Sequence, residues 1–409
     1  MGGDLKVGNF WLLKPYEAFG NRAEEIYFAL LKCRRDGLRL VLIKRKINLG
    51  WKFAFRSANR ALLDIDHPLV LNGVIFEVLN WFFSIFLALA RVTGMGFRFL
   101  EGKLGVSWVG NSLVKLSDIT VGHLGLWGEI AAPYQAANNR IDWKRCFDDK
   151  LGVTYRPRSF VDERFSLLRG RRYICLHVRD SGFFNDADFS ENRNANIKNY
   201  LLGIEWLVDA GYVVVRLGDP SMPQIDVAGV FDYAHSALRS ESCDIALVEH
   251  CDFYIGCQSG PIDLAALFEK RILTLNCYAL ACSFWYRNGS LFLPKQVVFN
   301  GRALTLGEQV RKNIFELNGT GKSVQGVEFI ENSPEDIKAA IVEFIFFERL
   351  TDDQVQFNRF LKDRVFSYFE SVPVWSSALA DASQKYRWAS RMGVTDGGVC
   401  DFYLKRNWS

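Results

Sequence analysis

The sequence has no strong charge imbalance, no zinc-type spacing of cysteines and no secretory leader. Its 50 basic and 46 acidic residues leave a formal net charge of +4, which is too small to indicate nucleic-acid binding on charge grounds. Its nine cysteines form no C-x-x-C pair, and an odd number without a leader is typical of reduced, buried thiols in the cytoplasm. We therefore expect a cytoplasmic protein with no nucleic-acid partner.

The most apolar stretch covers residues 69–92 and predicts a helix near 73–91. Its uncharged part, residues 78–90, is shorter than the roughly 20 apolar residues that span a bilayer. The few polar residues fall at helical spacing and form one narrow stripe: Glu77, Asn80, Ser84 and Arg91. The helix therefore either is buried in protein or lies flat in a membrane interface, at the inner face for a cytoplasmic protein.

The length predicts two domains, because 409 residues exceed what one hydrophobic core usually covers. Residues 5–13 are typical of a strand, residues 22–35 of a helix and residues 38–43 of a second strand, with a loop at 14–21. Together they form a β-loop-α-β unit. Residues 140–170 are charged and lack clear periodicity, so we place a domain boundary there.

From residue 173 onward, buried strands and helices alternate regularly. The predicted strands are 173–178, 212–217, 252–257 and 272–276. Their alternation with helices implies a doubly wound parallel sheet with right-handed crossovers. We therefore expect an N-terminal α/β domain at 1–168, a second α/β domain at 169–345, and C-terminal helices at 346–409 that pack back on the first domain.

Two polar side chains follow the strand that begins at Tyr173. His177 and Arg179 are two residues apart, so they can face one cleft, because side chains alternate along a strand. In open α/β sheets, ligands bind at the carboxyl ends of strands, and the planar guanidinium of arginine matches a phosphate. The pair therefore predicts a diphosphate site, with a structural histidine beside a surface arginine as the alternative.

Small residues stand at two other junctions between a strand and a helix. Ser259 and Gly260 follow a buried strand, where free backbone N–H groups can bind an anion, although Ser259 can equally be an ordinary N-cap. Gly20 and Asn21 fall between the first strand and its helix, where glycine permits close approach of a ligand or simply a tight turn. We expect all four to bind the diphosphate.

Further polar residues fall near the same predicted sheet edge: Arg193, Asn194, Asn196, Arg216, Gly218, Asp219 and Gln258. Each can line the cleft or serve as a cap or turn residue. His123 lies in a glycine-rich loop, where it can act as a base, contact an acceptor or be structural. Asp186 and Asp188 form an Asp-x-Asp pair in a loop, which is weak support for a metal, so we predict no metal site.

The order of these motifs resembles a family of proposed glycosyltransferases from bacterial surface-polysaccharide loci. The matching segments are Leu-His-Val-Arg-Asp at 176–180, Arg-Asn-Ala-Asn-Ile at 193–197, Val-Val-Arg-Leu-Gly-Asp at 214–219, Asp-Tyr-Ala-His-Ser at 232–236, Ile-Gly-Cys-Gln-Ser-Gly-Pro at 255–261 and the tail at 401–407. More distantly, His177-x-Arg179 and Phe19-Gly-Asn21 are similar to loops of GDP-fucose-dependent fucosyltransferases of the GT-B fold. Arg22 departs from the glutamine that is common in that loop.

The resemblance implies an α/β chain with two facing Rossmann-like domains, in which 169–345 binds a nucleotide-sugar and 1–168 binds the acceptor. It implies a glycosyltransferase that moves a hexosyl or deoxyhexosyl group from a nucleotide-sugar, with a GDP-sugar favoured. The acceptor would be a glycan or a lipid-linked molecule in surface-polysaccharide synthesis. In the fucosyltransferases the arginine of His-x-Arg binds the diphosphate without a metal, which implies that role for Arg179 and no cofactor, since the nucleotide-sugar is a substrate.

An inverting transfer needs a general base on the acceptor hydroxyl, and the candidates are Asp180, Asp186 and His123. Two other interpretations stay open at this point. One is a nucleotide-sugar epimerase or hydrolase on the same scaffold, which would act without an acceptor. The other is a non-catalytic nucleotide-sugar-binding protein, which would bind the donor without turnover.

Overall fold

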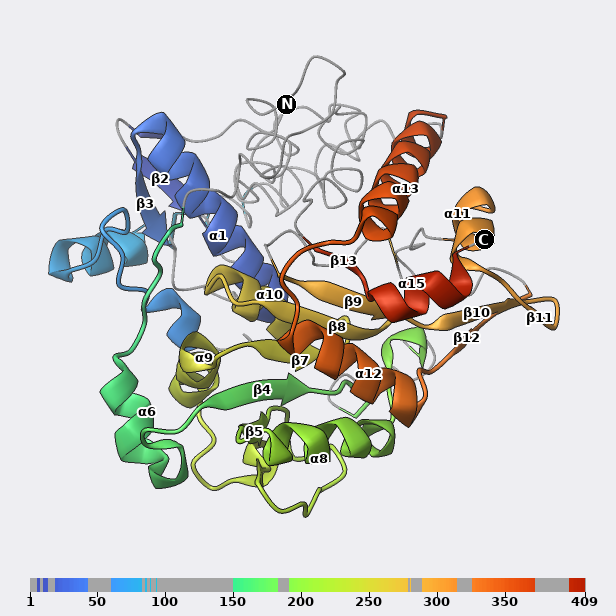
Figure 1. Ribbon diagram of the computed structural model, residues 1–409. Helices are drawn as coiled ribbons and strands as arrows, with labels where there is room; N and C mark the ends of the chain where they lie inside the picture. The colour runs from blue at the N-terminus through green and yellow to red at the C-terminus, as the bar shows by residue number, and fades with distance from the viewer. Residues whose placement is uncertain are drawn as a thin grey trace. The chain divides into compact units, whose positions relative to one another are not determined.

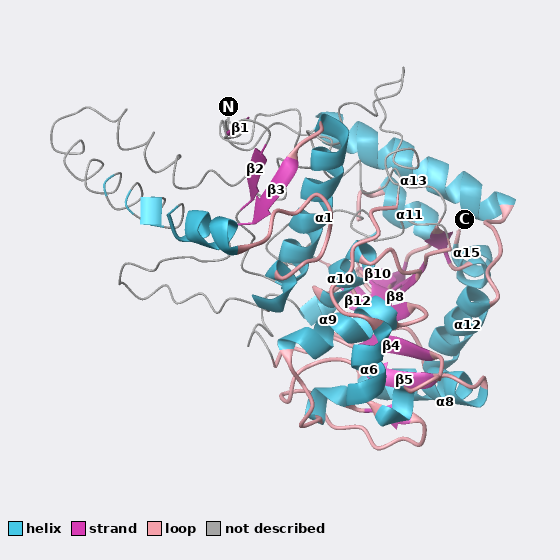
Figure 2. Cartoon of the chain, turned by 90° about the vertical axis from the view of Figure 1, so that its left-hand side faces the viewer, coloured by secondary structure: helices cyan, strands magenta, loops and turns pink. Residues whose placement is uncertain are grey.

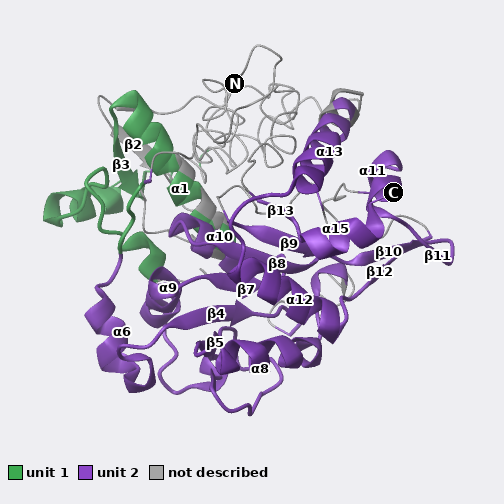
Figure 3. Cartoon of the chain, in the orientation of Figure 1, with its two compact units in different colours: residues 1–130, 151–154 green, residues 131–150, 155–409 purple. Residues whose placement is uncertain are grey.

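The computed structural model describes residues 6–7, 10–13, 19–42, 60–82, 85–86, 89, 93, 150–182, 191–278, 280, 289–314, 326–371 and 397–408. The chain divides into two compact units (Figure 3). Unit 1 comprises residues 1–130 and 151–154, and unit 2 comprises residues 131–150 and 155–409. Residues 131–150 and 155–168, which we assigned to the first domain, are therefore grouped with unit 2.

Unit 1 contains the predicted β-loop-α-β unit. Its sheet consists of β1 (Lys6–Val7), β2 (Phe10–Leu13) and β3 (Arg39–Leu42), and α1 (Phe19–Asp36) connects β2 to β3. β2 runs antiparallel to β1 and parallel to β3. Because α1 begins at Phe19 rather than at residue 22, Gly20 and Asn21 lie in its first turn and not in the predicted loop. Asparagine is a common N-cap residue, which is why the pattern placed the helix start after it.

Residues 74–82 are helical, as are residues 85, 86, 89 and 93, so the described part of the apolar stretch is helical. Its apolar side chains are not buried in protein: Val74 is 81% exposed and Phe82 is 63% exposed. The described apolar side chains of this helix are therefore exposed rather than part of a described core. Among the described residues, no helix has both the length and the apolarity needed to cross a membrane.

Unit 2 is built on a seven-stranded sheet with the order β13-β9-β8-β7-β4-β5-β6 (Figure 1). The strands are β4 (Tyr173–His177), β5 (Val213–Arg216), β6 (Val230–Phe231), β7 (Tyr254–Gly256), β8 (Ile272–Cys277), β9 (Leu291–Pro294) and β13 (Gly398–Val399). All neighbouring strands are parallel. From β4, the chain continues to β5 and β6 on one side, then returns to β7, β8 and β9 on the other. This is the strand order of a Rossmann-like sheet and confirms the α/β class.

Helices cover both faces of this sheet. The helices are α6 (Arg158–Arg164), α8 (Leu201–Asp209), α9 (Glu241–His250), α10 (Pro261–Leu267) and α12 (Pro334–Ile345). Figure 2 shows α9 and α10 on one side of the strands and α8 and α12 on the other. The sheet is therefore doubly wound, as the alternation of the sequence predicts.

The two faces of β4 bury alternate residues, as expected for a strand between two layers of helices. Ile174 and Leu176 belong to the core that also contains the inner faces of α8 and α12. The hydroxyl of Tyr173 points the other way and donates to the carbonyl oxygen of Leu247 in α9. His177 has the same parity as Tyr173, which places it on the α9 face of the sheet. The seven cysteines among the described residues are buried.

The C-terminal third contains a small sheet and the helix α11 (Leu306–Arg311), which the pattern did not predict, together with helices in the predicted C-terminal region. β10 (Gln296–Phe299), β11 (Arg302–Ala303) and β12 (Val327–Ile330) form a separate small sheet, followed along the chain by α13 (Asp352–Ser371) and α15 (Asp401–Asn407), with α11 after β11. In the described part of 346–409, α13 contacts α11 and α15 contacts α12, all in unit 2. The expectation that residues 346–409 pack back on the N-terminal domain stays a prediction.

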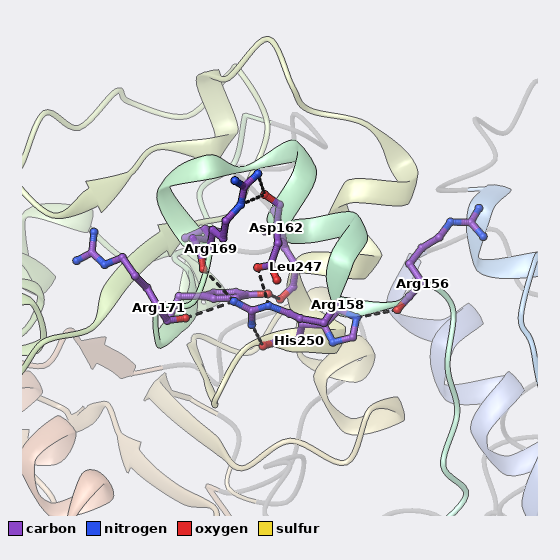
Figure 4. A network of polar contacts seen from close by, with 9 residues as sticks. Arg156, Arg158, Asp162, Arg169, Arg171, Leu247 and His250 are labelled. Carbon is purple, nitrogen blue, oxygen red and sulfur yellow. Dashed lines mark hydrogen bonds and ion pairs between the residues drawn. The ribbon is translucent and has the colours of Figure 1, made fainter.

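Arg158, at the start of α6, ties three chain segments together at the amino end of β4 (Figure 4). Its guanidinium donates to the carbonyl oxygens of Leu168 at 2.9 Å, of Arg171 at 3.3 Å and of His250 at 3.2 Å. It also forms an ion pair with Asp162 at 3.0 Å. Hydrophobic periodicity cannot detect hydrogen bonds between distant segments. For this reason the sequence pattern placed residues 155–168 in a boundary region rather than in unit 2.

Replacing Arg158 with alanine should lower the free energy of unfolding by about 2 kcal/mol, because hydrogen bonds from a charged donor to three carbonyl oxygens are lost. Urea unfolding followed by circular dichroism measures this. The matched control is Arg164→Ala on the same helix, where the guanidinium lies over the ring of Phe160 and a change within about 0.5 kcal/mol is expected. Equal stability of the two variants would contradict the assignment.

Candidate functional site

The candidate site lies at the carboxyl edge of the seven-stranded sheet, where β4 and β7 are neighbours. The strand order reverses between these two strands, and this is the point at which open α/β sheets bind ligands. His177 is in register with Gly256, so the residues that follow them along the chain meet at the same edge. The backbone N–H of Arg179 donates to the thiol sulfur of Cys257 at 2.9 Å, which fixes the two loops to each other.

Ser259 and His177 are in direct contact across this pair of strands. The Ser259 hydroxyl oxygen lies 3.0 Å from Nδ1 of His177 and 3.2 Å from the carbonyl oxygen of Cys257. A hydroxyl carries one proton, so Ser259 donates either to Nδ1 or to that carbonyl, and the histidine tautomer changes with it. Ser259 is not the N-cap of α10, because Gly260 holds that position without a side-chain cap.

His177 is neutral at physiological pH. Its pKa is lowered from 6.5 to about 4, mainly by burial and in addition by the positive charges of Arg216 and Arg179, while the charge of Asp219 opposes the shift. A neutral imidazole keeps one N–H donor and one acceptor nitrogen. The contributions of Arg216 and Arg179 to this shift place two positive charges near the end of β4, and nearby positive charge favours binding of an anion.

The segment that contains Arg193 and Asn194 is fixed over the edge by three hydrogen bonds. The guanidinium of Arg179 donates to the side-chain oxygen of Asn194, and Nζ of Lys295 donates to its carbonyl oxygen at 2.8 Å. Nε of Arg193 donates to the carbonyl oxygen of Gln258 at 3.2 Å. Arg179 is 5% exposed and Lys295 is 3% exposed, so two cations are buried beside one asparagine.

Arg216 is buried behind the site and does not form part of its surface. It is 1% exposed and donates from Nη1 to Asp232 at 3.0 Å. The other carboxylate oxygen of Asp232 lies 3.0 Å from Nδ1 of His235. Gly218 follows with φ of +151°, a backbone conformation that favours glycine, and Asp219 accepts a hydrogen bond from the backbone of Ser221. Arg216, Gly218 and Asp219 therefore shape the loop after β5.

The other predicted site residues differ in where they lie. Asn196 caps the short helix after it by accepting from the N–H of Lys198, so it acts in local structure. Asp180 accepts from the backbone N–H of Gly182 at 3.0 Å, in the loop after β4. Gly20 and Asn21 belong to unit 1, and their role in diphosphate binding stays a prediction. Residues 123 and 186, the other two base candidates, lie outside the described residues.

The sequence reasoning did not select Lys295, Asp232 and His235 as site residues. Lys295 directly follows β9, a run of four buried residues, and a lysine that ends a buried strand is the signal that was available. Asp232 and His235 stand in one of the quoted motifs, but β6 is only two residues long and has no detectable alternation. Across the described ranges, no group of three or more histidine, cysteine, aspartate or glutamate residues is arranged to hold a metal ion.

Comparison with known proteins gives only distant likenesses. No family model matches the chain, and no curated protein matches it. Among solved structures, ADP-heptose LPS heptosyltransferase II of E. coli is similar at 15% identity and a TM-score of 0.37, over 66% of this chain and 84% of that one. A family 9 glycosyl transferase from Veillonella parvula is similar at 10% identity and a TM-score of 0.33, over 67% of this chain and 81% of that one. The S. aureus MnaA–UDP co-structure is similar at 10% identity and a TM-score of 0.25, over 66% of this chain and 79% of that one.

The low pKa of His177 predicts a specific pH dependence of stability. The unfolded chain takes up a proton at this histidine near pH 6.5 and the folded chain only near pH 4, so the free energy of unfolding should fall as the pH drops between these values. His177→Asn keeps an acceptor for Ser259 and should remove about 3 kcal/mol of this fall. Urea unfolding of both proteins from pH 7 to pH 4 measures the difference, and parallel curves would contradict it.

Proposed function

We propose that the chain is a glycosyltransferase that binds a nucleoside diphosphate sugar at the carboxyl edge of β4 and β7. The observation that carries this proposal is the gathering of His177, Ser259, Arg179 and Lys295 at the point where the strand order reverses. A neutral histidine and two buried cations form a site for a multiply charged anion that needs both donors and positive charge. The order of motifs along the sequence supports a glycosyltransferase among the enzymes that bind such anions.

In this proposal, the acceptor hydroxyl attacks the anomeric carbon while the bond from that carbon to the diphosphate oxygen breaks. The nucleoside diphosphate leaves with the electron pair, and Arg179 and Lys295 stabilise the growing negative charge. An anion beside His177 favours the tautomer with the proton on Nε2, because Ser259 then donates to Nδ1 and Nε2 can donate to a phosphate oxygen. The base that takes the hydroxyl proton is Asp180, Asp186 or His123.

The finer parts of the proposal concern the substrates. A GDP-sugar is the favoured donor because of the similarity of His177-x-Arg179 to the fucosyltransferase loops. The acceptor is a glycan or a lipid-linked molecule in surface-polysaccharide synthesis, and the transferred group is a hexosyl or deoxyhexosyl group. The transfer is independent of metal, since Arg179, Lys295 and His177 supply the charge and the donors that a metal ion would otherwise provide.

Nucleoside diphosphates should raise the melting temperature of the protein, because a ligand that binds only the native state stabilises it. We expect the largest rise with GDP in a comparison with UDP, ADP, CMP and dTDP. Arg179→Ala should lose this rise, and Arg179→Lys should recover part of it, because lysine keeps the charge but loses the planar fork. The measurement is thermal unfolding with and without each nucleotide.

The matched control for Arg179 is Arg171→Ala, which removes an exposed arginine at the opposite end of β4. Its response to nucleotides should equal that of the unchanged protein. If Arg179→Ala still responds to every nucleotide like the control, Arg179 does not bind the diphosphate and the site proposal fails.

Release of the nucleoside diphosphate from the donor should depend on an acceptor and proceed at an unchanged rate in EDTA. The donor to use is the sugar conjugate of the nucleotide that stabilises the protein most. Loss of activity in EDTA with recovery in magnesium would contradict metal independence and direct attention to Asp186 and Asp188. Release or isomerisation of the sugar without any acceptor would instead support a hydrolase or an epimerase.

A further inference from the structure

The helix at 74–82, with its continuation at residues 85, 86 and 89, exposes large apolar side chains over most of its described length. The exposed residues are Val74, Ile75, Val78, Leu79, Trp81, Phe82, Ile85, Phe86 and Leu89. At 100° per residue, these nine positions fall within one continuous arc of about 160°. Exposed apolar residues scattered singly are normal, but a continuous face of this size on a soluble protein marks an interaction site.

The opposite side of the same helix faces the protein and carries its polar residues. Asn80 is 3% exposed, and its side-chain N–H donates to the carbonyl oxygen of Leu42 at 2.7 Å. Glu77 and Phe76 lie on the same side and are half-buried. A helix on the surface of a water-soluble domain normally has the reverse arrangement, with apolar residues inward and polar residues outward. The outward face is therefore built for an apolar environment.

The sequence that follows β3 is strongly basic. Leu42, which accepts the hydrogen bond from Asn80, ends β3, and Lys44, Arg45 and Lys46 follow almost at once. Between Asp36 and Asp64 the sequence contains seven basic residues and no acidic one. An apolar helix face with a tryptophan beside a basic segment is the combination that binds anionic lipid surfaces, because burial of apolar area and attraction to lipid phosphates add up.

We propose that the helix at 74–82, with residues 85, 86 and 89, lies in the interface of an anionic lipid bilayer, with its apolar face inserted among the acyl chains. The hydrogen bond from Asn80 to Leu42 holds the inner side of the helix on the protein, so the helix lies along the bilayer surface. This surface belongs to unit 1 and does not depend on the function proposed for the sheet edge of unit 2.

Co-sedimentation of the full chain with vesicles tests the proposal. The protein should bind vesicles of phosphatidylcholine mixed with phosphatidylglycerol, bind pure phosphatidylcholine less, and lose affinity as the salt concentration rises. The variant Val74→Ser, Val78→Ser and Phe82→Ser removes apolar area from the most exposed part of the face. Its affinity for the mixed vesicles should fall at least about tenfold, with an unchanged circular dichroism spectrum.

The control is Phe346→Ser, which removes an exposed phenylalanine of unit 2 and should leave vesicle binding unchanged. Three outcomes would overturn the proposal. One is equal binding of the triple variant and the unchanged protein. Another is unfolding of the triple variant, which would assign the face to the core. The third is a dimer in analytical ultracentrifugation that the triple variant dissociates while neither protein binds vesicles, which would make a second copy of the chain the partner.

Discussion

The close approach of β4 and β7, where the strand order reverses, is the constraint on which the candidate site depends. A Cβ on Gly256 would come within 2.8 Å of the carbonyl oxygen of His177, so a side chain there would force the two strands apart. The contact between His177 and Ser259 needs that spacing, because both side chains follow from the ends of these strands. The chain leaves β4 and β7 toward opposite sides, and the segment at 193–194 spans the edge between them.

The parts of the fold that were predictable are those in which hydrophobic pattern and chain order act locally. β4, β5, β7 and β8 are short, fully buried runs bounded by turn residues, and their alternation with helices specifies a parallel sheet. The same order specifies which strand ends share an edge. That is why His177, Arg179 and Ser259 could be grouped before any coordinates, although their partners could not be named.

The parts that were not predictable depend on contacts between distant segments. Lys295 joins the site because β9 is parallel to β8 and ends at the same edge, which its own neighbourhood in the sequence does not reveal. Asp232 acquires its role only from the buried Arg216. The helix at 74–82 shows a further limit: periodicity reveals a polar stripe and an apolar face, but not which of them meets the protein. The hydrogen bond from Asn80 to Leu42, 38 residues earlier, shows that the polar side of the helix meets the protein.

The outermost strand of the seven-stranded sheet has a consequence for the synthesis of the protein. β13 pairs with β9, and the segment that contains it and α15 buries Val399, Tyr403 and Leu404. The ribosome adds these residues about a hundred positions after β9, so the nascent chain displays an open parallel edge throughout that interval. Such an edge can pair with strands of other chains and lead to aggregation. A chaperone bound during this interval of translation would therefore protect the protein most.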